Sequence, residues 1–473
     1  MLFPTTDFAI FFAVVFTANW LLNPYPRVWK LFMVAASFLF YSWWDWHYVL
    51  LLAASTTIAC AGAAILSRYE GRERKVAFVT TLAGLLGLLG WFKYYTFIAV
   101  NIDDLTRHLA GGGPLPLKEV LLPVGISFFT FMAISYVIDV YRKELAVARP
   151  VDLAVYLSFF PHLVAGPIVR GEELLPQIRH KRDPRHIDVG RALWLIAAGL
   201  FKKMVISAYI SSSIVDPVFG SPHTHSNLEI LFAIYGYAIQ IYADFSGYTD
   251  IAIGVALLLG FSFPQNFDAP YTARSLQDFW RRWHMTLSRW LRDYLYIPLG
   301  GNKGSESRIA RNIMLTMILG GLWHGAGWTF VAWGAYHGFG QVAGRWRRNR
   351  QRASGAPPVA ETRWRVVVER VVTFHLVCLG WVFFRATSIS VAFTMIGRLF
   401  TAWGSSPLVT PLVVITIVGS IASQYVSVEM VGNVQRAFSR QTALVQGAIL
   451  GAVLLGITTL APEGVQPFIY FRF

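Results

Sequence analysis

The run LEILFAIYGYAIQIYADFSGYTDIAIGVALLLGFS, residues 228–262, decides the fold class of this chain, because it holds only three charged side chains in 35 residues. Apolar runs of about 20 residues are long enough to cross a bilayer as helices. Since barrel strands are shorter and alternate in polarity, runs of this length indicate helices. This run is too long for one ordinary crossing and rich in glycine, so we expect a broken or paired helix.

Further apolar runs recur along the 473 residues, of which 55% are hydrophobic and 14% charged, against roughly a quarter charged in soluble domains. The sequence predicts an all-α, polytopic integral membrane protein of one domain, residues 1–473, with about 11 or more transmembrane helices and broken or re-entrant helices around a central pocket. The candidate spans are 7–23, 30–44, 47–67, 76–98, 120–140, 192–214, 228–262, 313–343, 366–384, 408–427 and 443–461.

Two segments depart from simple crossings. YLSFFPHLVAGPI, residues 156–168, is too short and too often interrupted by proline and glycine to span, which favours a re-entrant hairpin. Residues 313–343 must enter and leave on the same side for the crossings to keep their parity, which requires a break near GLWHGAG. His324 lies at that break.

The net charge of +15 comes from Lys and Arg in the short connections between apolar runs. This is the positive-inside pattern, so we expect the basic connections to be cytoplasmic and both termini to lie outside, with no nucleic-acid partner. GRWRRNRQRASGAPPVAETRWR, residues 344–365, is predicted to be a flexible cytoplasmic linker. Residues 462–473 form an extracytoplasmic aromatic tail, whose default role is an anchor at the membrane interface.

Several simpler kinds of site are not indicated. Cys60 and Cys378 lie far apart in apolar segments, which suggests neither a disulfide nor a thiolate metal site. His223 and His225 alternate in SPHTHS without a third ligand nearby, so we expect a surface loop and no metal. No Lys or Arg precedes Arg27, so the first helix is expected to stay in the mature protein.

GGLWHGAGWTFVAWGAYHG, residues 320–338, contains His324 and His337 in an apolar, glycine-rich setting. A histidine inside a membrane is costly unless it is used or paired. It could act as a general base, since an apolar pocket keeps imidazole neutral. Alternatively, the glycines at small-xxx-small spacing pack helices together, and each histidine bonds to a neighbouring helix.

The segment LQDFWRRWHMTLSRWLRDYLYIPLGG, residues 276–301, has helical periodicity with tryptophans along one broad face. An interfacial helix anchored by aromatic and arginine side chains explains most of these residues. His284 and Ser288 are one turn apart, so they could form an inward polar edge while the tryptophans face lipid. The basic side chains could also attract the phosphates of a nucleotide-like thioester donor, or an anionic lipid.

Asp244 and Asp250 interrupt the run that decides the fold. Six residues apart, they point about 120° away from each other on a regular helix, so an acid/base dyad is not expected. Two interpretations remain: the aspartates hold neighbouring helices together through Asp–Arg or Asp–Trp contacts, or they form a proton relay.

Taken together, these motifs resemble the membrane-bound O-acyltransferases, in particular the alginate O-acetylation type. The resemblance covers most of the chain. The matching segments are WFKYYTF (91–97), LPVGISFFTFMAISYVIDVYR (122–142), FFPHLVAGPIVR (159–170), DFSGYTDIAIG (244–254), NFDAPY (266–271), DFWRRWHMTLSRWLRDYLYIPLGG (278–301) and GLWHGAGW (321–328).

This resemblance implies that His324 is the catalytic histidine and His284 the second histidine of the site. It also implies that Tyr470, in the terminal FIYFRF, relays the acyl group outward. The expected donor is acetyl-CoA or another acyl thioester, with no permanently bound cofactor, and the expected acceptor is a surface polysaccharide. An extracytoplasmic SGNH-type acetyltransferase or esterase-like partner is implied, in the bacterial inner membrane among its lipids.

Two alternative functions remain from the sequence. The chain could acylate a lipid, a glycolipid or a secreted peptide, although the alginate-type motifs and the terminal tyrosine argue against this. Broken helices and intramembrane aspartates would also suit a transporter of an acylated carrier that catalyses nothing.

Overall fold

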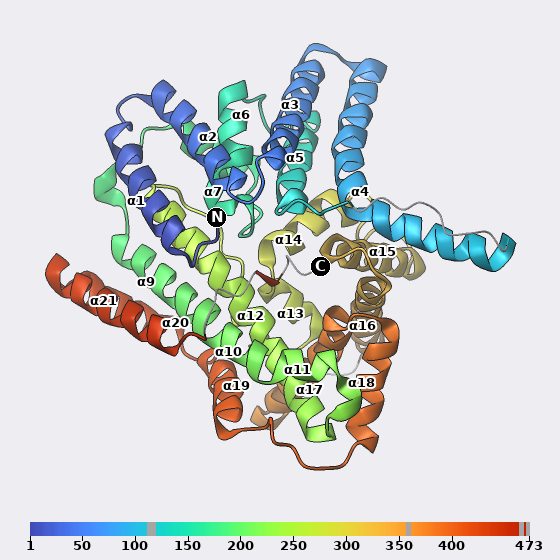
Figure 1. Ribbon diagram of the computed structural model, residues 1–473. Coiled ribbons are helices and arrows are strands. Elements are labelled where there is room, and N and C mark those ends of the chain that lie inside the picture. Colours follow the sequence, from blue (N-terminus) through green and yellow to red (C-terminus); the bar gives the residue numbers. More distant parts are fainter. Residues whose placement is uncertain (111–119, 356–360, 463–467, 470–473) are drawn as a thin grey trace. The chain divides into compact units, whose positions relative to one another are not determined.

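The computed structural model describes residues 1–110, 120–355, 361–462 and 468–469, and the regular structure in these ranges is entirely helical (Figure 1). The all-α prediction is confirmed. Where the sequence predicts one domain, contacts divide the chain into two compact units that alternate along it. Unit 1 comprises Met1–Asp188 and Ala252–Pro264, and unit 2 comprises Val189–Ile251 and Gln265–Phe473.

Unit 1 contains eight helices, and α3, α4, α6 and α8 contact α5, whose side chains from Ile126 to Val140 are all buried. The predicted hairpin at 156–168 forms the end of α6 and the single turn α7, which are separated at Phe159 and buried. The helices of unit 1 are α1 (Thr6–Leu21), α2 (Pro26–Ser42), α3 (His47–Arg68), α4 (Gly71–Ala110), α5 (Ile126–Tyr141), α6 (Pro150–Ser158), α7 (Phe160–Leu163) and α8 (Gly171–Arg179).

Unit 2 contains most of the residues singled out by the sequence. Its helices are α9 (Val189–Leu200), α10 (Ala208–Ile210), α11 (Asp216–Gly220), α12 (Asn227–Leu258, as far as residue 251), α13 (Leu276–Arg282), α14 (Met285–Leu291), α15 (Glu306–His324), α16 (Trp328–Ala353), α17 (Arg363–Arg385), α18 (Ile389–Thr401), α19 (Pro411–Ser423), α20 (Val428–Ser439) and α21 (Ala443–Leu460). Helical turns of π type, Phe201–Ser207 and Ser211–Val215, flank α10.

Helix α12 is continuous over Asn227–Leu258, so the expectation of a broken or paired helix at 228–262 is wrong (Figure 1). Its glycines serve close packing instead. A Cβ on Gly199 would lie 2.5 Å from the carbonyl oxygen of Gly247, a distance that two packed backbones cannot accommodate. Glycine in an apolar helix can therefore mark a helix contact as well as a kink.

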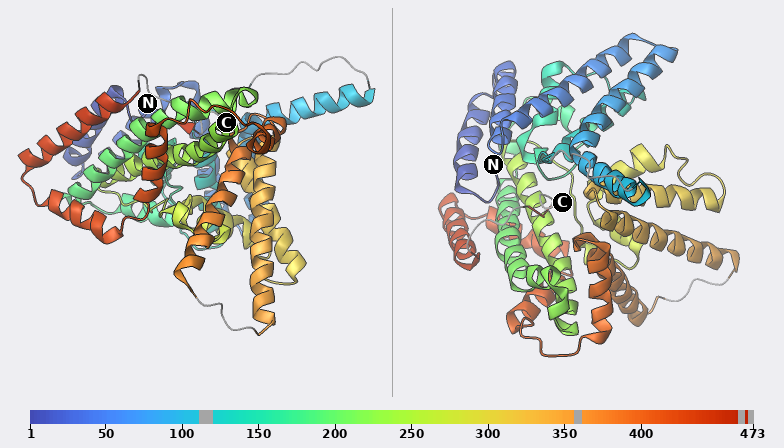
Figure 2. Two further views of the ribbon diagram at one scale, coloured as in Figure 1. Left: turned by 90° about the horizontal axis from the view of Figure 1, so that it is seen from below. Right: turned by 45° about the vertical axis from the view of Figure 1, so that its right-hand side comes forward.

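The break predicted within 313–343 is confirmed. α15 ends at His324, Gly325–Gly327 are not helical, and α16 begins at Trp328 and returns along α15. α16 also packs beside α17 (Figure 2). It continues to Ala353, so the first ten residues of the predicted linker are helical, and residues 356–360 lie outside the described ranges.

Within the described residues, six helices are long and apolar enough to cross a membrane, or seven if α19 and α20 form one span bent by 94°. Three further apolar helices, α1, α5 and α18, are shorter. The multi-pass character predicted from the sequence is confirmed. A count of 11 or more spans, like the sidedness of the basic connections, stays a prediction.

Candidate active site

A cavity of about 510 Å³ lies within unit 2, lined by residues of α13 to α16 and of the turns between them. His324 lines it together with Trp333 and Thr316, and arginine side chains line it as well. These arginines are Arg281, Arg289, Arg292, Arg345 and Arg348. A buried imidazole and a group of cations therefore share one cavity.

His324 is held at the cavity wall by the end of α15. Its ring lies edge-on to aromatic rings, with centroid distances of 5.1 Å to Trp333 and 5.2 Å to Phe384. The helix stops at Gly325, where an added Cβ would lie 2.1 Å from the ring of Phe330. Glycine at this position lets the aromatic ring pack against the chain directly after the histidine.

His284 is also buried, but the single helix predicted over 276–301 is wrong. α13 ends at Arg282 and α14 begins at Met285, and His284 between them has φ 42° and ψ 56°. Left-handed backbone is uncommon for residues other than glycine and persists only where the surroundings hold it. Hydrogen bonds to the side chain of Asn266 stabilise this backbone conformation.

The side-chain oxygen of Asn266 accepts hydrogen bonds from the Thr286 amide at 3.2 Å and the Thr286 hydroxyl at 2.9 Å. It also lies 3.1 Å from Nδ1 of His284. Because a backbone amide can only donate, this Asn266 atom is the acceptor, and His284 must donate from Nδ1. Nε2 of His284 then carries a lone pair.

The structure brings the two histidines together, with ring centroids 6.5 Å apart. His284 lies outside the candidate spans, and burial lowers its pKa to about 3, so its ring is neutral at physiological pH. Among the described residues its Nε2 has no hydrogen-bond partner. Phe245 covers the His284 ring edge-on at 4.6 Å.

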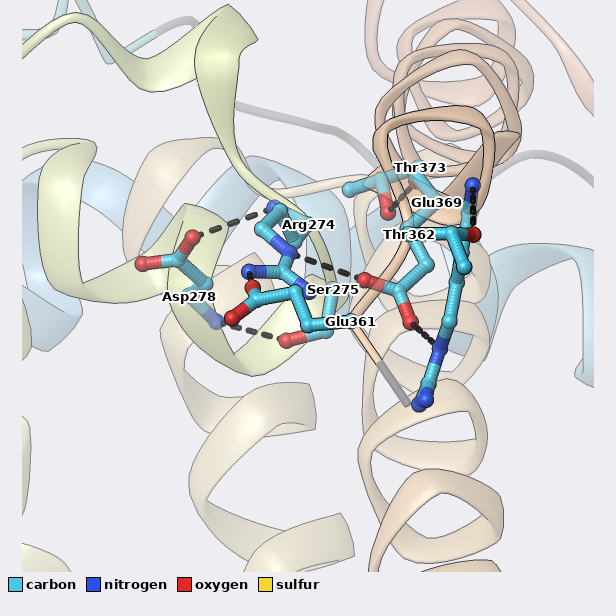
Figure 3. Close-up of polar contacts among 8 residues, drawn as sticks. Arg274, Ser275, Asp278, Glu361, Thr362, Glu369 and Thr373 are labelled. Carbon is cyan, nitrogen blue, oxygen red and sulfur yellow. Dashed lines mark hydrogen bonds and ion pairs between the residues drawn. The ribbon is translucent and has the colours of Figure 1, made fainter. Parts of the chain in front are cut away.

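A polar cluster fixes the start of α13 (Figure 3). This helix carries Arg281 and leads to His284. Arg274 forms ion pairs with Glu361 and, at 2.8 Å, with Glu369 of α17. The Ser275 hydroxyl caps α13 by accepting from the Asp278 amide at 3.1 Å. None of these side chains was singled out from the sequence. The glutamate partners of Arg274 come from a distant segment, whereas Ser275 and Asp278 are only three residues apart.

In segment 276–301, Ser288 lies inward as suggested by its spacing from His284, whereas two tryptophans differ from their predicted positions. Ser288 lines the cavity, and its hydroxyl donates to the carbonyl oxygen of Trp283 at 3.3 Å. Trp283 and Trp290 were expected to face lipid, and both are buried. They pack against aromatic neighbours inside unit 2, so hydrophobic periodicity here marks the protein interior and not a lipid-facing surface.

His337 and the pair His223 and His225 do not join the site. His337 is buried against Trp280 and Trp333 and does not line the cavity. His223 is exposed, as expected for a surface loop, and His225 pairs with Glu229 at 3.1 Å. No group of His, Cys, Asp or Glu in the described part of the chain could hold a metal ion.

Asp244 and Asp250 each pair with a lysine, whereas one of the two interpretations of the sequence was contacts with arginine or tryptophan. Lys203 binds Asp244 and Lys202 binds Asp250. Both lysines lie in the π-helical turn Phe201–Ser207, whose irregular geometry gives no periodic signal in the sequence. The two carboxylates are separate, as their spacing predicted.

Tyr470 lies outside the described residues, but the two residues directly before it are described. Phe468 and Ile469 are buried in unit 2, with exposed fractions of 0% and 3%. The expected role of the tail as an interface anchor is therefore wrong for Phe468.

Sequence reasoning missed Asn266, which lies in the quoted NFDAPY segment without an assigned role. It also placed Arg345 and Arg348 in a linker, whereas both line the cavity from α16. Extension of the helical pattern beyond residue 343 could have revealed them, because arginine favours helices.

Comparison with known proteins identifies the chain. The model of the membrane-bound O-acyltransferase family (MBOAT) matches residues 37–382. The chain is 38% identical over 424 residues to the probable alginate O-acetylase AlgI of Pseudomonas aeruginosa, covering 86% of this chain and 77% of that protein. It is 38% identical over 411 residues to the probable alginate O-acetylase AlgI of Azotobacter vinelandii, covering 85% and 78%.

A relative named for a different activity is the peptidoglycan O-acetyltransferase of Helicobacter pylori. The chain is 34% identical to it over 424 residues, covering 83% of this chain and 78% of that protein. A family match over most of the chain agrees with the multi-pass helical structure. This chain belongs to the membrane-bound O-acyltransferase family and is a membrane O-acyltransferase.

Proposed function

We propose that the protein takes an acetyl group from a phosphate-bearing thioester, such as acetyl-CoA, at the cytoplasmic side of the bacterial inner membrane and delivers it for O-acetylation of an extracellular polysaccharide. The observation that carries this proposal is the cavity shared by His324 and the arginines. The polysaccharide acceptor is supported by relatives whose names include alginate and peptidoglycan acetylation.

The charge around the cavity favours a donor with phosphates. Arg281 and Arg348 have no carboxylate partner among the described residues, whereas Arg345 forms a bidentate pair with Glu306. Burial and the nearby cations of Arg352, Arg281 and Arg345 lower the pKa of Arg348, which reports a concentration of positive charge. Guanidinium groups bind phosphate oxygens in a fixed, bidentate geometry.

The volume of the cavity, about 510 Å³, lies within the usual range of about 300–1,000 Å³ for small-molecule sites. We infer that the phosphates of the donor bind the arginines and that its thioester lies beside His324. The acetyl group itself has no charge. The arginines therefore bind the carrier part of the donor, and the reaction takes place at the histidine.

The proposed reaction is general-base catalysis. A ring nitrogen of His324 takes the proton of an acceptor hydroxyl while the hydroxyl oxygen attacks the thioester carbonyl. The new C–O bond forms, the C–S bond breaks, and the thiolate regains a proton from the imidazolium. His284, with its lone pair on Nε2, acts as the second histidine and accepts a hydrogen bond from the acceptor side.

The acceptor side of the proposal involves the C-terminus. Tyr470 is the one hydroxyl of FIYFRF and follows the buried Ile469 directly in the sequence. We propose that it takes the acyl group from the site and presents it outward. An extracytoplasmic SGNH-type or esterase-like partner then completes the transfer to the polysaccharide.

Removal of the unpaired arginines tests the donor. Arg281→Ala with Arg348→Ala should raise KM for acetyl-CoA about 10- to 100-fold, because each hydrogen bond to a charged group is worth roughly 1.5–3 kcal/mol. kcat should change little. Initial rates in membranes, at several donor concentrations and two ionic strengths, measure both constants. The wild-type KM should rise with salt, because ions screen the exposed charges.

The matched control is Arg347→Ala, which removes an exposed arginine of α16 that does not line the cavity. Its KM should stay within about twofold of the wild type, since surface charges contribute little. An unchanged KM in the double variant would show that the donor does not use these arginines.

Asn266→Ala tests the positioning of His284. The substitution removes one acceptor from three buried donors, which costs about 1–3 kcal/mol per unsatisfied group. Because His284 does not line the cavity, kcat should fall about tenfold or more while KM for the donor stays constant. Steady-state rates give this split, and Thr286→Ser, which keeps the hydroxyl donor, serves as the control. Equal changes in the Asn266→Ala and Thr286→Ser variants would argue against the role of Asn266.

A further inference from the structure

The carboxylate of Asp244 is buried and makes contacts on both of its oxygens. Oδ1 forms an ion pair with the Lys203 ammonium and accepts from the Ser207 hydroxyl at 3.4 Å. Oδ2 accepts from the backbone N–H of Ile469 at 2.8 Å. The carboxylate that pairs α12 with the π-helical turn therefore also binds Ile469, which lies 225 residues later in the sequence.

The residue before Ile469 is held as well. The ring of Phe468 packs against Tyr248 and Phe245, with centroid distances of 4.8 Å and 5.5 Å. The ammonium of Lys203 lies 5.9 Å from the Phe468 ring centroid. Lys203 and Asp244 thus contact the same two-residue segment through a cation and a carboxylate.

This segment is connected to the histidines through one ring. Phe245, which packs against Phe468, also covers His284 at 4.6 Å. His284 in turn lies 6.5 Å from His324. The C-terminal segment therefore packs next to the wall of the candidate active site.

A neighbouring ion pair provides a comparison within the same helices. Lys202 directly precedes Lys203, Asp250 lies six residues after Asp244, and these two side chains form an ion pair of their own. The side chains of Lys202 and Asp250 are 21% and 24% exposed, whereas those of Lys203 and Asp244 are each 3% exposed. Among the described residues, Asp250 bonds to Lys202, and the N–H of Ile469 bonds to Asp244 instead. Burial of a charge pair is costly unless additional hydrogen bonds satisfy it. At Asp244, the N–H of the C-terminal segment provides such a bond.

We propose that the Asp244–Lys203 ion pair anchors the C-terminal segment inside the protein, and that Asp244 is a positioning residue for acyl transfer. The anchoring follows from the contacts alone. Its importance for catalysis rests on the proposed function, because only an acyl path that includes the C-terminus requires the segment to be fixed beside His284.

The anchoring is tested by the accessibility of a tail thiol. Ile469→Cys keeps the backbone N–H, and Cys60→Ala with Cys378→Ala removes the native thiols. In isolated membranes, a water-soluble maleimide should label this parent slowly. Asp244→Ala with Lys203→Met removes both charges and the acceptor without leaving a buried unpaired ion, and labelling should then accelerate at least about tenfold.

The matched control is Asp250→Ala with Lys202→Met, which removes the neighbouring pair and should leave the labelling rate of the tail thiol unchanged. Labelling after denaturation and gel filtration in detergent check that each variant is present and folded. Rapid labelling of the parent, or equal protection in both double variants, would overturn the anchor. This readout does not depend on acyl transfer, so it can fail or succeed independently of the proposed function.

A second variant tests the anchor when the double variant does not fold. Ile469→Pro deletes the N–H that donates to Asp244 and fixes φ of that residue, whereas Ile469→Val keeps the N–H. We expect acetylation at least about tenfold slower with proline than with valine, at an unchanged KM for the donor. Equal rates for proline and valine would contradict the positioning role of Asp244.

Discussion

His324→Ala is expected to lower acyl transfer by about two to four orders of magnitude, the range that a general base contributes. The side chain lines the cavity and lies 6.5 Å, between ring centroids, from His284. Alanine leaves no group at the cavity wall that can take the proton of the acceptor hydroxyl. The remaining histidine, His284, lies outside the cavity proposed to hold the thioester, so it cannot replace His324 beside the reacting carbonyl. The rate is measured as transfer of labelled acetyl in membranes that contain equal amounts of protein.

His337→Gln is the matched control. His337 is also a buried histidine of the α15–α16 region, but it does not line the cavity. Activity should stay within a few-fold of the wild type, and both variants should elute as the wild type does in gel filtration. Wild-type activity in His324→Ala, or an equal loss in both variants, would remove His324 from the chemistry.

Gly321→Val should have the largest effect on folding. A Cβ at Gly321 would lie 2.2 Å from the carbonyl oxygen of Phe330 and 3.3 Å from Cα of Gly334, so α15 and α16 would have to separate. Overpacking of a well-packed core typically costs about 1–3 kcal/mol, and here the obstacle is backbone, which cannot rotate away. These two helices form much of the cavity wall, so activity should be lost with the fold. Yield and melting temperature in detergent measure the effect.

Gly451→Val controls for the change of residue type. Gly451 lies in the apolar helix α21, and nothing lies within 4 Å of the position of its Cβ. Its melting temperature should stay near that of the wild type. If Gly321→Val melted at the same temperature as Gly451→Val, the close packing of α15 on α16 would be incorrect.

The sequence predicted the helical fold from local composition and the break at His324 from the order of apolar runs and basic connections along the chain. Long apolar runs require helices in lipid, and the parity of basic connections required a turn within 313–343. The continuous helix α12 was not predicted, because the function of Gly247 depends on Gly199, in another part of the chain. A glycine that permits packing and a glycine that permits a bend look the same in a single sequence.

The candidate site was predicted only in part. His284 and His324 were identified as residues, but the left-handed backbone at His284 depends on Asn266, which is bonded to it across a loop. The partners Lys202 and Lys203 were missed because a π-helical turn has no regular apolar period. The burial of Phe468 depends on tertiary contacts, whereas its composition and terminal position indicated an interface anchor.

The central claim is that His324, in the cavity with the arginines, takes an acetyl group from a thioester for delivery to an extracellular polysaccharide. A donor with one label on the acetyl group and a second on its carrier tests this in membrane vesicles that contain the extracytoplasmic partner and the polysaccharide. With the wild type, the acetyl label should appear in the polysaccharide fraction while the carrier label stays behind. With His324→Ala, neither label should appear there. Wild-type amounts of acetyl label in the polysaccharide from His324→Ala vesicles would contradict the account.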